Sequence, residues 1–282
     1  MTKVLLPVSL ACVLLAAGCG GSSKPSLPTI GAARTYALTD FQPSTPVAVG
    51  RPTRISFTIT QPNGEPLTDF KRGPGPHTGV HLIIVRRDLS SIVHVHPPIA
   101  PDGRISETVT FTQPGPYRVV VDAYPNTTGP QRNFQLFTSL RVAGRYVPKS
   151  LPAFTSSVVA DGYRFTLHGR PTLHAIQAGT LTVTVADPNG KPAEFTPWYG
   201  ALAHAIFFRK GTLDYFHTHV CARGASGCAS FLGATQVTGS SSTPGKLAVG
   251  VLVPVAGTWR LFLQTKVNGH ILTAPFTLAV KP

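Results

Sequence analysis

The chain has 282 residues, of which 13% are charged and 42% hydrophobic, and it contains 27 glycines and 27 prolines. This length suits one or two domains with real cores, and the many turn residues and the abundant Val, Thr, Phe and Ile predict an all-β fold. The net charge of +14 favours binding to polyanions. The basic residues are scattered and form no aromatic–basic stripe, which argues against nucleic acid as the partner. An anionic membrane face or a cell-wall polymer fits better. The alternative is that the charge only keeps the surface soluble.

The start of the chain has the composition of a signal peptide. After a short positive start, residues 4–17 form an apolar run that is too short to cross a bilayer comfortably. The run ends in Ala-Ala-Gly-Cys at residues 16–19. This resembles a bacterial lipobox, which implies that Cys19 is lipidated. We therefore expect residues 1–18 to be a signal peptide, residues 19–33 a flexible tether, and the protein to be lipid-anchored at the extracytoplasmic face of the cell membrane. An ordinary cleaved signal peptide is the alternative, and no later segment is long and apolar enough to be transmembrane.

The rest of the chain reads as two copies of one unit. In chain order, each copy has a strand of alternating polarity that enters a Pro-Asn-Gly turn, an apolar strand that starts with His, and a strand that follows a glycine turn. These segments are residues 54–66, 81–87 and 116–121 in the first copy and 180–192, 204–210 and 258–263 in the second. About seven short strands per copy predict two tandem immunoglobulin-like antiparallel β-sandwich domains. We place them at residues 34–147 and 150–282, with the second an internal repeat of the first.

Six of the ten histidines occupy matching positions in the two copies. They are His81, His94 and His96 in the first copy and His204, His217 and His219 in the second. Residues two apart on a strand share a face, so the last two histidines of each set point the same way. If residues 88–89 are a two-residue hairpin loop, residue 81 lies opposite residue 96, and the three imidazoles converge. A register with 81 opposite 94 also works, whereas a one-residue shift breaks the cluster.

Three neutral imidazoles that face one point suit Cu²⁺ or Zn²⁺. The sequence therefore predicts one metal site per domain, and His77, in a Pro-Gly-rich loop, is a candidate fourth ligand in the first domain. The competing interpretation is structural, because duplication copies histidines that bond to backbone as faithfully as it copies ligands. His168, His174 and His270 have no counterpart, and we expect them at the surface or in loops.

Two cysteines remain in the folded part, Cys221 and Cys228. In an oxidising compartment we expect them to close a small disulfide loop. The alternative is that Cys221, two residues after His219, joins the metal site.

Three motifs resemble a known group of proteins. They are His-Leu-Ile-Ile-Val-Arg-Arg-Asp-Leu at 81–89, His-Val-His-Pro at 94–97 and Pro-Gly-Pro-Tyr-Arg-Val at 114–119. Together they look like bacterial exported proteins with YtkA-like or similar immunoglobulin-like domains of the heavy-metal-binding, copper-handling kind. The resemblance implies metal binding at the cell envelope. One departure is that Met1 is the only methionine, so no thioether site for Cu(I) exists.

The main expectation is thus a membrane-tethered metal-binding protein, a buffer or carrier for Cu²⁺ or Zn²⁺. The alternative is a non-metal interaction or adhesion module that binds another envelope protein, with an aromatic cluster as its contact patch. That cluster is Phe195, Trp198, Tyr199, Phe207, Phe208 and Tyr215. An enzyme is not expected, because the acids close to the histidines in sequence, Asp88 and Asp214, do not occupy matching positions in the two copies.

Overall fold

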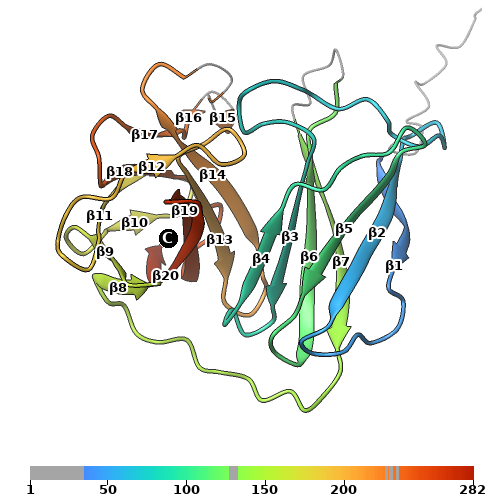
Figure 1. Ribbon diagram of the computed structural model, residues 1–282, viewed down its shortest axis with the longest axis horizontal. Helices are drawn as coiled ribbons and strands as arrows, with labels where there is room; N and C mark the ends of the chain where they lie inside the picture. The colour runs from blue at the N-terminus through green and yellow to red at the C-terminus, as the bar shows by residue number, and fades with distance from the viewer. Residues whose placement is uncertain (1–34, 127–132, 226–227, 229–230, 233–234) are drawn as a thin grey trace, which may run out of the picture. The chain divides into compact units, whose positions relative to one another are not determined.

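The computed structural model describes residues 35–126, 133–225, 228, 231–232 and 235–282, which form strands joined by turns and loops (Figure 1). The expected signal peptide and tether, with Cys19, lie outside these residues. In the part of the chain that the structure describes, no helix is long and apolar enough to cross a membrane. Both sandwich halves, from Thr35 to Pro282, fold together as one unit.

The first half is a sandwich of two antiparallel sheets, with strand orders β1-β2-β5 and β4-β3-β6-β7. Alternation along β2 turns Ile55, Phe57 and Ile59 inward, where they share a core with Leu82 and Ile84 of β3. The strands are β1 (Ala37–Gln42), β2 (Pro52–Thr60), β3 (Val80–Arg86), β4 (Ile92–Val95), β5 (Arg104–Thr110), β6 (Gly115–Ala123) and β7 (Phe134–Val142).

The second half repeats this arrangement. The order β9-β11-β18 matches β1-β2-β5, and β14-β13-β19-β20 matches β4-β3-β6-β7. Strand β17 pairs with both β14 and β18, so that here the two layers belong to one continuous sheet. The strands are β8 (Ser157–Ala160), β9 (Tyr163–Leu167), β10 (Leu173–His174), β11 (Gly179–Ala186), β12 (Phe195–Thr196), β13 (Ala203–Arg209), β14 (Tyr215–Ala222), β15 (Phe231–Leu232), β16 (Thr235–Gln236), β17 (Gly239–Ser241), β18 (Lys246–Val251), β19 (Gly257–Val267) and β20 (His270–Lys281). The prediction of two tandem immunoglobulin-like sandwiches is confirmed.

The Pro-Asn-Gly turns predicted after β2 and β11 are both present. The Gly64 N–H donates to the Gln61 carbonyl at 2.9 Å, and the Gly190 N–H donates to the Asp187 carbonyl at 3.0 Å. The two glycines have φ values of 91° and 83°. Such values suit glycine because it has no Cβ to clash with the backbone.

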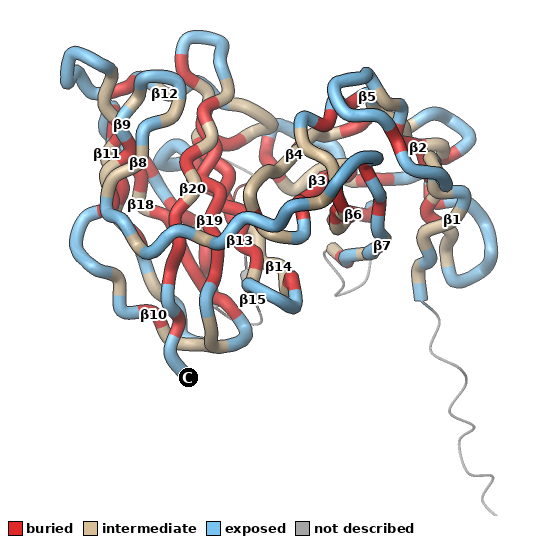
Figure 2. The backbone as a smooth tube through the Cα atoms, turned by 90° about the horizontal axis from the view of Figure 1, so that it is seen from below, coloured by how far each residue is buried: buried red, intermediate tan, exposed pale blue. Residues whose placement is uncertain are grey.

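Strands β3 and β13 are buried on both faces, as their uninterrupted apolar sequences suggest. In β3, Leu82 and Ile84 face the core of their own sandwich, whereas Ile83 and Val85 face away from it. The even positions of β13 face away in the same manner. Figure 2 shows β13 and β19 buried over much of their length. The outward side chains of the two halves pack together in a cluster that we call the interface layer: Ile83, Val85, Leu89, Val120, Ile206, Phe208, Leu213 and Phe262.

An arginine at the end of each of these strands secures a neighbouring turn. Arg86 Nε donates to the Pro114 carbonyl at 3.0 Å, and Arg209 Nε donates to the Ala256 carbonyl at 2.9 Å. The first arginine also forms a buried ion pair with Asp88. These contacts give a physical reason why the arginine is identical in the two copies.

Candidate metal centre

Two hairpins, β3–β4 and β13–β14, position the histidines. Leu82 pairs with Val95 and Ile83 with His94, which sets residue 81 opposite residue 96. This is the first of the two predicted registers. In the second half, His204 pairs directly with His219. Each hairpin therefore carries its histidines on the face that points away from its own core.

The two sets of histidines do not form separate sites. The ring of His81 lies 5.2 Å from that of His217, and the ring of His94 lies 4.9 Å from that of His204, measured between centroids. Because both sets face outward, the interface layer brings them against each other. The histidines expected at two sites therefore lie together with His77 in one group, which we call the histidine cluster: His77, His81, His94, His96, His204, His217 and His219.

Three groups of three histidines have ligand atoms within 4.8 Å of one another. One group, His81/His94/His96, is the set expected for the first domain. The other two mix the halves, and the set expected for the second domain is not among the groups found in the described residues. The groups are His81/His94/His96, His81/His217/His219 and His94/His204/His217.

His77 does not complete the first set. Its Nε2 lies 3.1 Å from Nδ1 of His219, a residue of the second half, and it belongs to none of the three groups in the described chain. A ligand role for His77 in the first domain therefore stays a prediction. The Pro-Gly-rich loop carries His77 across to the hairpin of the other half. His168 and His270 are exposed, as expected, whereas His174 is half-buried in β10.

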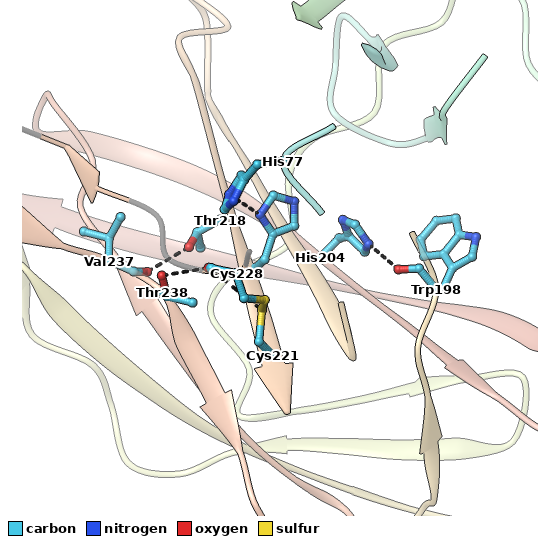
Figure 3. The surroundings of a disulfide bond; sticks show 9 residues. His77, Trp198, His204, Thr218, Cys221, Cys228, Val237 and Thr238 are labelled. Atoms are coloured by element: carbon cyan, nitrogen blue, oxygen red, sulfur yellow. Dashed lines mark hydrogen bonds between the residues drawn. A yellow bond between two sulfur atoms is a disulfide. The ribbon is translucent and has the colours of Figure 1, made fainter. Parts of the chain in front are cut away.

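Hydrogen bonds hold several of the rings by one nitrogen. His81 Nε2 donates to the Pro76 carbonyl at 2.8 Å. His204 Nε2 donates to the Trp198 carbonyl at 2.9 Å (Figure 3). His94 Nδ1 donates to the side-chain oxygen of Gln264 at 3.1 Å. Since a neutral imidazole carries one proton, each of these rings keeps a lone pair on its other nitrogen. Metal-binding histidines are commonly oriented in this way.

The remaining ring nitrogens face the interior of the cluster. A buried polar atom without a partner costs about 1–3 kcal/mol, so a group of them is unfavourable unless something binds there. A metal ion can accept several converging lone pairs at once. The nitrogens that are buried without a hydrogen bond to the described residues are His81 Nδ1, His94 Nε2, His96 Nε2, His204 Nδ1, His219 Nε2 and both nitrogens of His217.

Burial keeps the histidines in the neutral form that metals require. Desolvation, which is the largest cause, and the neighbouring histidines lower the pKa of His81, His94, His217 and His219 well below its usual value. The pKa of His96 is lowered for the same reasons. Desolvation lowers the pKa of His204 to about 4.

A carboxylate that the sequence reasoning missed lies beside the cluster. Asp122 pairs with His81 across β3 and β6, and its Oδ2 lies 4.0 Å from His217 Nδ1. Desolvation raises the pKa of Asp122 to about 6, although three side chains donate hydrogen bonds to it. They are Asn133, Gln135 and Tyr215. The repeat provides a signal for this residue, because the matching stretches continue by one position to Asp122 and Gln264.

Asp122 and Gln264 make reciprocal contacts across the two halves. Gln264 of the second half holds His94 of the first, and Asp122 of the first approaches His217 of the second. His94 and His217 are matching positions, so the cluster has an approximate twofold relation. The relation is not exact, because Asp122 is an acid and its counterpart Gln264 is a neutral amide.

Aromatic side chains enclose the cluster. Trp198 and Tyr199 begin a tight turn in which Tyr199 and Gly200 both have positive φ, 48° and 77°. The Tyr199 ring stacks on His96, with centroids 3.7 Å apart. Tyr215 donates to Asp122 at 3.2 Å. The members of the proposed aromatic contact patch are therefore buried or half-buried rather than gathered on the surface.

Cys221 and Cys228 form a disulfide (Figure 3). Both cysteines are buried against Ala201. Because its sulfur is bonded, Cys221 offers no thiolate, and the alternative that it joins the metal site is not supported.

Comparison with protein families finds one match, a domain of unknown function (DUF8832), at residues 35–144 and 157–282. The match includes both halves of the molecule. This match does not show the heavy-metal-binding, YtkA-like family that the motifs resemble. Comparison with curated proteins gives no match.

The chain is also similar to several solved structures. A chimeric titin Z1Z2 carrying a decorin peptide is 13% identical, with 89% of this chain and 99% of that chain covered and a TM-score of 0.25. Fibronectin(III)-like modules of Clostridium thermocellum CbhA are 11% identical, with 88% and 93% covered and a TM-score of 0.22. A tetra-tandem repeat of a large adhesion protein is 16% identical, with 88% and 50% covered and a TM-score of 0.25. At these values the likeness concerns the fold alone.

Proposed function

The chain belongs to the DUF8832 family, whose description carries no activity, and from the geometry of the cluster we propose that the protein binds Cu²⁺ or Zn²⁺ at one site shared by its two halves. The observation that carries the proposal is the convergence, from both hairpins, of buried ring nitrogens that have no hydrogen-bond partner among the described residues. A purely structural role would leave these nitrogens without partners. Imidazole nitrogens are ligands that both ions accept.

The spacing of the rings supports coordination. An imidazole that binds at about 2.0–2.1 Å has its centroid about 3.2 Å from the ion, so two tetrahedral ligands have centroids about 5 Å apart. In the group of His94, His204 and His217, the centroids are 4.9, 5.3 and 5.6 Å apart. The rings need only small adjustments to hold one ion.

The burial of the ligands favours retention over catalysis. His81 and His204 are fully buried, and His94 and His219 are at most 5% exposed. A metal enclosed by protein ligands is typical of sites that store an ion or stabilise a fold, whereas catalytic sites keep an open position. We therefore assign a buffer or storage role and no enzymatic activity.

Attachment to the membrane completes the proposal. The tether and Cys19 would hold the binding unit at the extracytoplasmic face, where it could exchange metal with another envelope protein. Metabolic labelling with a fatty acid tests this part, because a Cys19→Ala variant would stay unlabelled and leave the membrane fraction.

Titration of the chelator-treated full chain with Cu²⁺ or Zn²⁺ tests the binding itself. His94→Asn from the first half and His204→Asn from the second should each weaken binding by about tenfold or more, because the site needs both halves. His168→Asn, at an exposed position, is the matched control. The proposal fails if the wild type binds no more tightly than a variant in which all six paired histidines are alanine.

A cell-envelope interaction module is the second candidate. The solved structures to which this chain is similar include a large adhesion protein and a bacterial integrin-binding protein, which agrees with the alternative expectation from the sequence. The two candidates differ in one result, because partner or cell-wall binding that survives the six-alanine variant would favour the interaction module.

A further inference from the structure

His217 differs from the other histidines of the mixed groups. His81, His94 and His204 each use one nitrogen to donate to an oxygen, and His219 uses one toward His77. Both nitrogens of His217 are buried without a hydrogen bond to the described residues. The Asp122 oxygen lies 4.0 Å from Nδ1, which is too far for a hydrogen bond.

His217 also lies at the centre of the cluster. Its ring centroid is 5.2 Å from that of His81 and 5.3 Å from that of His94. It is 5.6 Å from His204 and 4.4 Å from His219. The ring therefore has neighbours from both halves of the molecule.

The three ligand groups overlap in a restrictive way. Any two of them share one histidine, which is His81, His94 or His217. Two ions can occupy two groups together only if the shared ring binds both, which requires both of its nitrogens. His81 and His94 would have to give up a hydrogen bond to do so. His217 would not, and it is the residue shared by the two mixed groups.

We propose that the histidine cluster holds two divalent ions, one on His81, His217 and His219 and the other on His94, His204 and His217, with the His217 ring as an imidazolate bridge. This inference rests on the proposed function and extends it from one ion to two.

The chemistry of the bridge is ligand exchange without oxidation or reduction. The first ion bonds to the nitrogen of His217 that carries a lone pair. The N–H proton of the other nitrogen leaves to solvent when the second ion bonds there. Ions about 2.0 Å from each ring nitrogen lie about 6 Å apart, and the imidazolate and Asp122 supply negative charge that reduces their repulsion. His96 and His77 lie outside both groups.

Copper titration with electron paramagnetic resonance tests the bridge. The chelator-treated full chain is titrated with Cu²⁺, the bound ions are counted by elemental analysis after gel filtration, and the spectrum is recorded at each step. Two ions per chain are expected. The signal should rise with the first ion and fall with the second, because an imidazolate bridge couples the two spins antiferromagnetically.

Variants separate this inference from the proposed function. His217→Ala should bind at most one ion and show no spin coupling, whereas His168→Asn, at an exposed position, should keep two coupled ions. If His217→Ala does not fold, the wild-type titration decides alone. One ion per chain, or two whose signals simply add, would overturn the bridge and leave metal binding intact, while no bound ion would overturn both.

Discussion

Acid should destabilise the metal-free protein strongly, because six histidines of the cluster resist protonation in the folded state. Burial lowers the pKa of His204 to about 4, whereas a histidine of the unfolded chain titrates near about 6.5. The folded-state pKa is the lower one, so the unfolded state binds more protons between these values. The free energy of unfolding therefore falls as the pH drops from about 6.5 toward 4.

The expected loss is large compared with the stability of a domain. For His204 alone, a difference of about 2.5 pH units corresponds to roughly 3 kcal/mol. The pKa values of the other five shift in the same direction. Domains are stable by about 5–15 kcal/mol, so we expect the metal-free chain to unfold before the pH reaches 4.

Asp122 opposes this trend. Its folded-state pKa is raised to about 6, so its contribution to stability is present at low pH and is lost as the pH rises through that value. On acidification it offsets part of the loss that the histidines cause. One carboxyl group against six imidazoles leaves the net change unfavourable.

Urea unfolding of the chelator-treated full chain, followed by tryptophan fluorescence between about pH 7.5 and 4.5, measures this dependence. His204→Asn should reduce the slope by about one proton, or about 1.4 kcal/mol per pH unit. His168→Asn, at the surface, should leave the slope unchanged. The reasoning would be refuted if the free energy of unfolding stayed constant or rose as the pH was lowered from about 6.5 to about 5.

Three further perturbations test contacts around the site. Arg86→Leu should lower the free energy of unfolding by about 3–5 kcal/mol, because its ion-pair partner Asp88 is buried. Arg209→Leu should lower it by only roughly 1 kcal/mol, because the ion pair of Arg209 is about a third exposed. Equal losses for the two variants in urea unfolding would contradict this account. Gly200→Ala should shift the Trp198 turn and weaken metal binding in titration. An added Cβ would lie 2.5 Å from the Pro74 carbonyl oxygen, and residue 200 has a φ of +77° that strains any side chain. Unchanged affinity would argue against a role for this turn. Cys221→Ser with Cys228→Ser should lower the thermal midpoint but keep the number of bound ions, and a lost ion would return Cys221 to the ligand set.

Much of the fold was predictable because the signals are local. The turn after β2 needs a glycine at residue 64, and the repeat of this turn at residue 190 revealed the duplication. A two-residue loop at residues 88–89 predicted His81 opposite His96, and the structure has this register rather than the alternative with His81 opposite His94.

The shared site was not predictable from these patterns. Alternation along β3 shows that His81 and Ile83 share a face, but it does not reveal that this face meets a second sheet. Outward Ile83 and Val85 are as apolar as inward Leu82 and Ile84, so these positions show no polarity difference that would mark the contact. Asp122 was missed for a related reason, since it lies next to His81 across the sheet but 41 positions away in the chain.

The tandem arrangement gives the cluster a freedom that a homodimer lacks. Two identical subunits around a twofold axis must present the same residue from both sides, so a change on one side is also a change on the other. Here one gene encodes both sides, and Asp122 has diverged from Gln264 while each still faces the opposite half. The fused protein can therefore tune two neighbouring coordination environments independently, for example by making one ion leave more readily than the other.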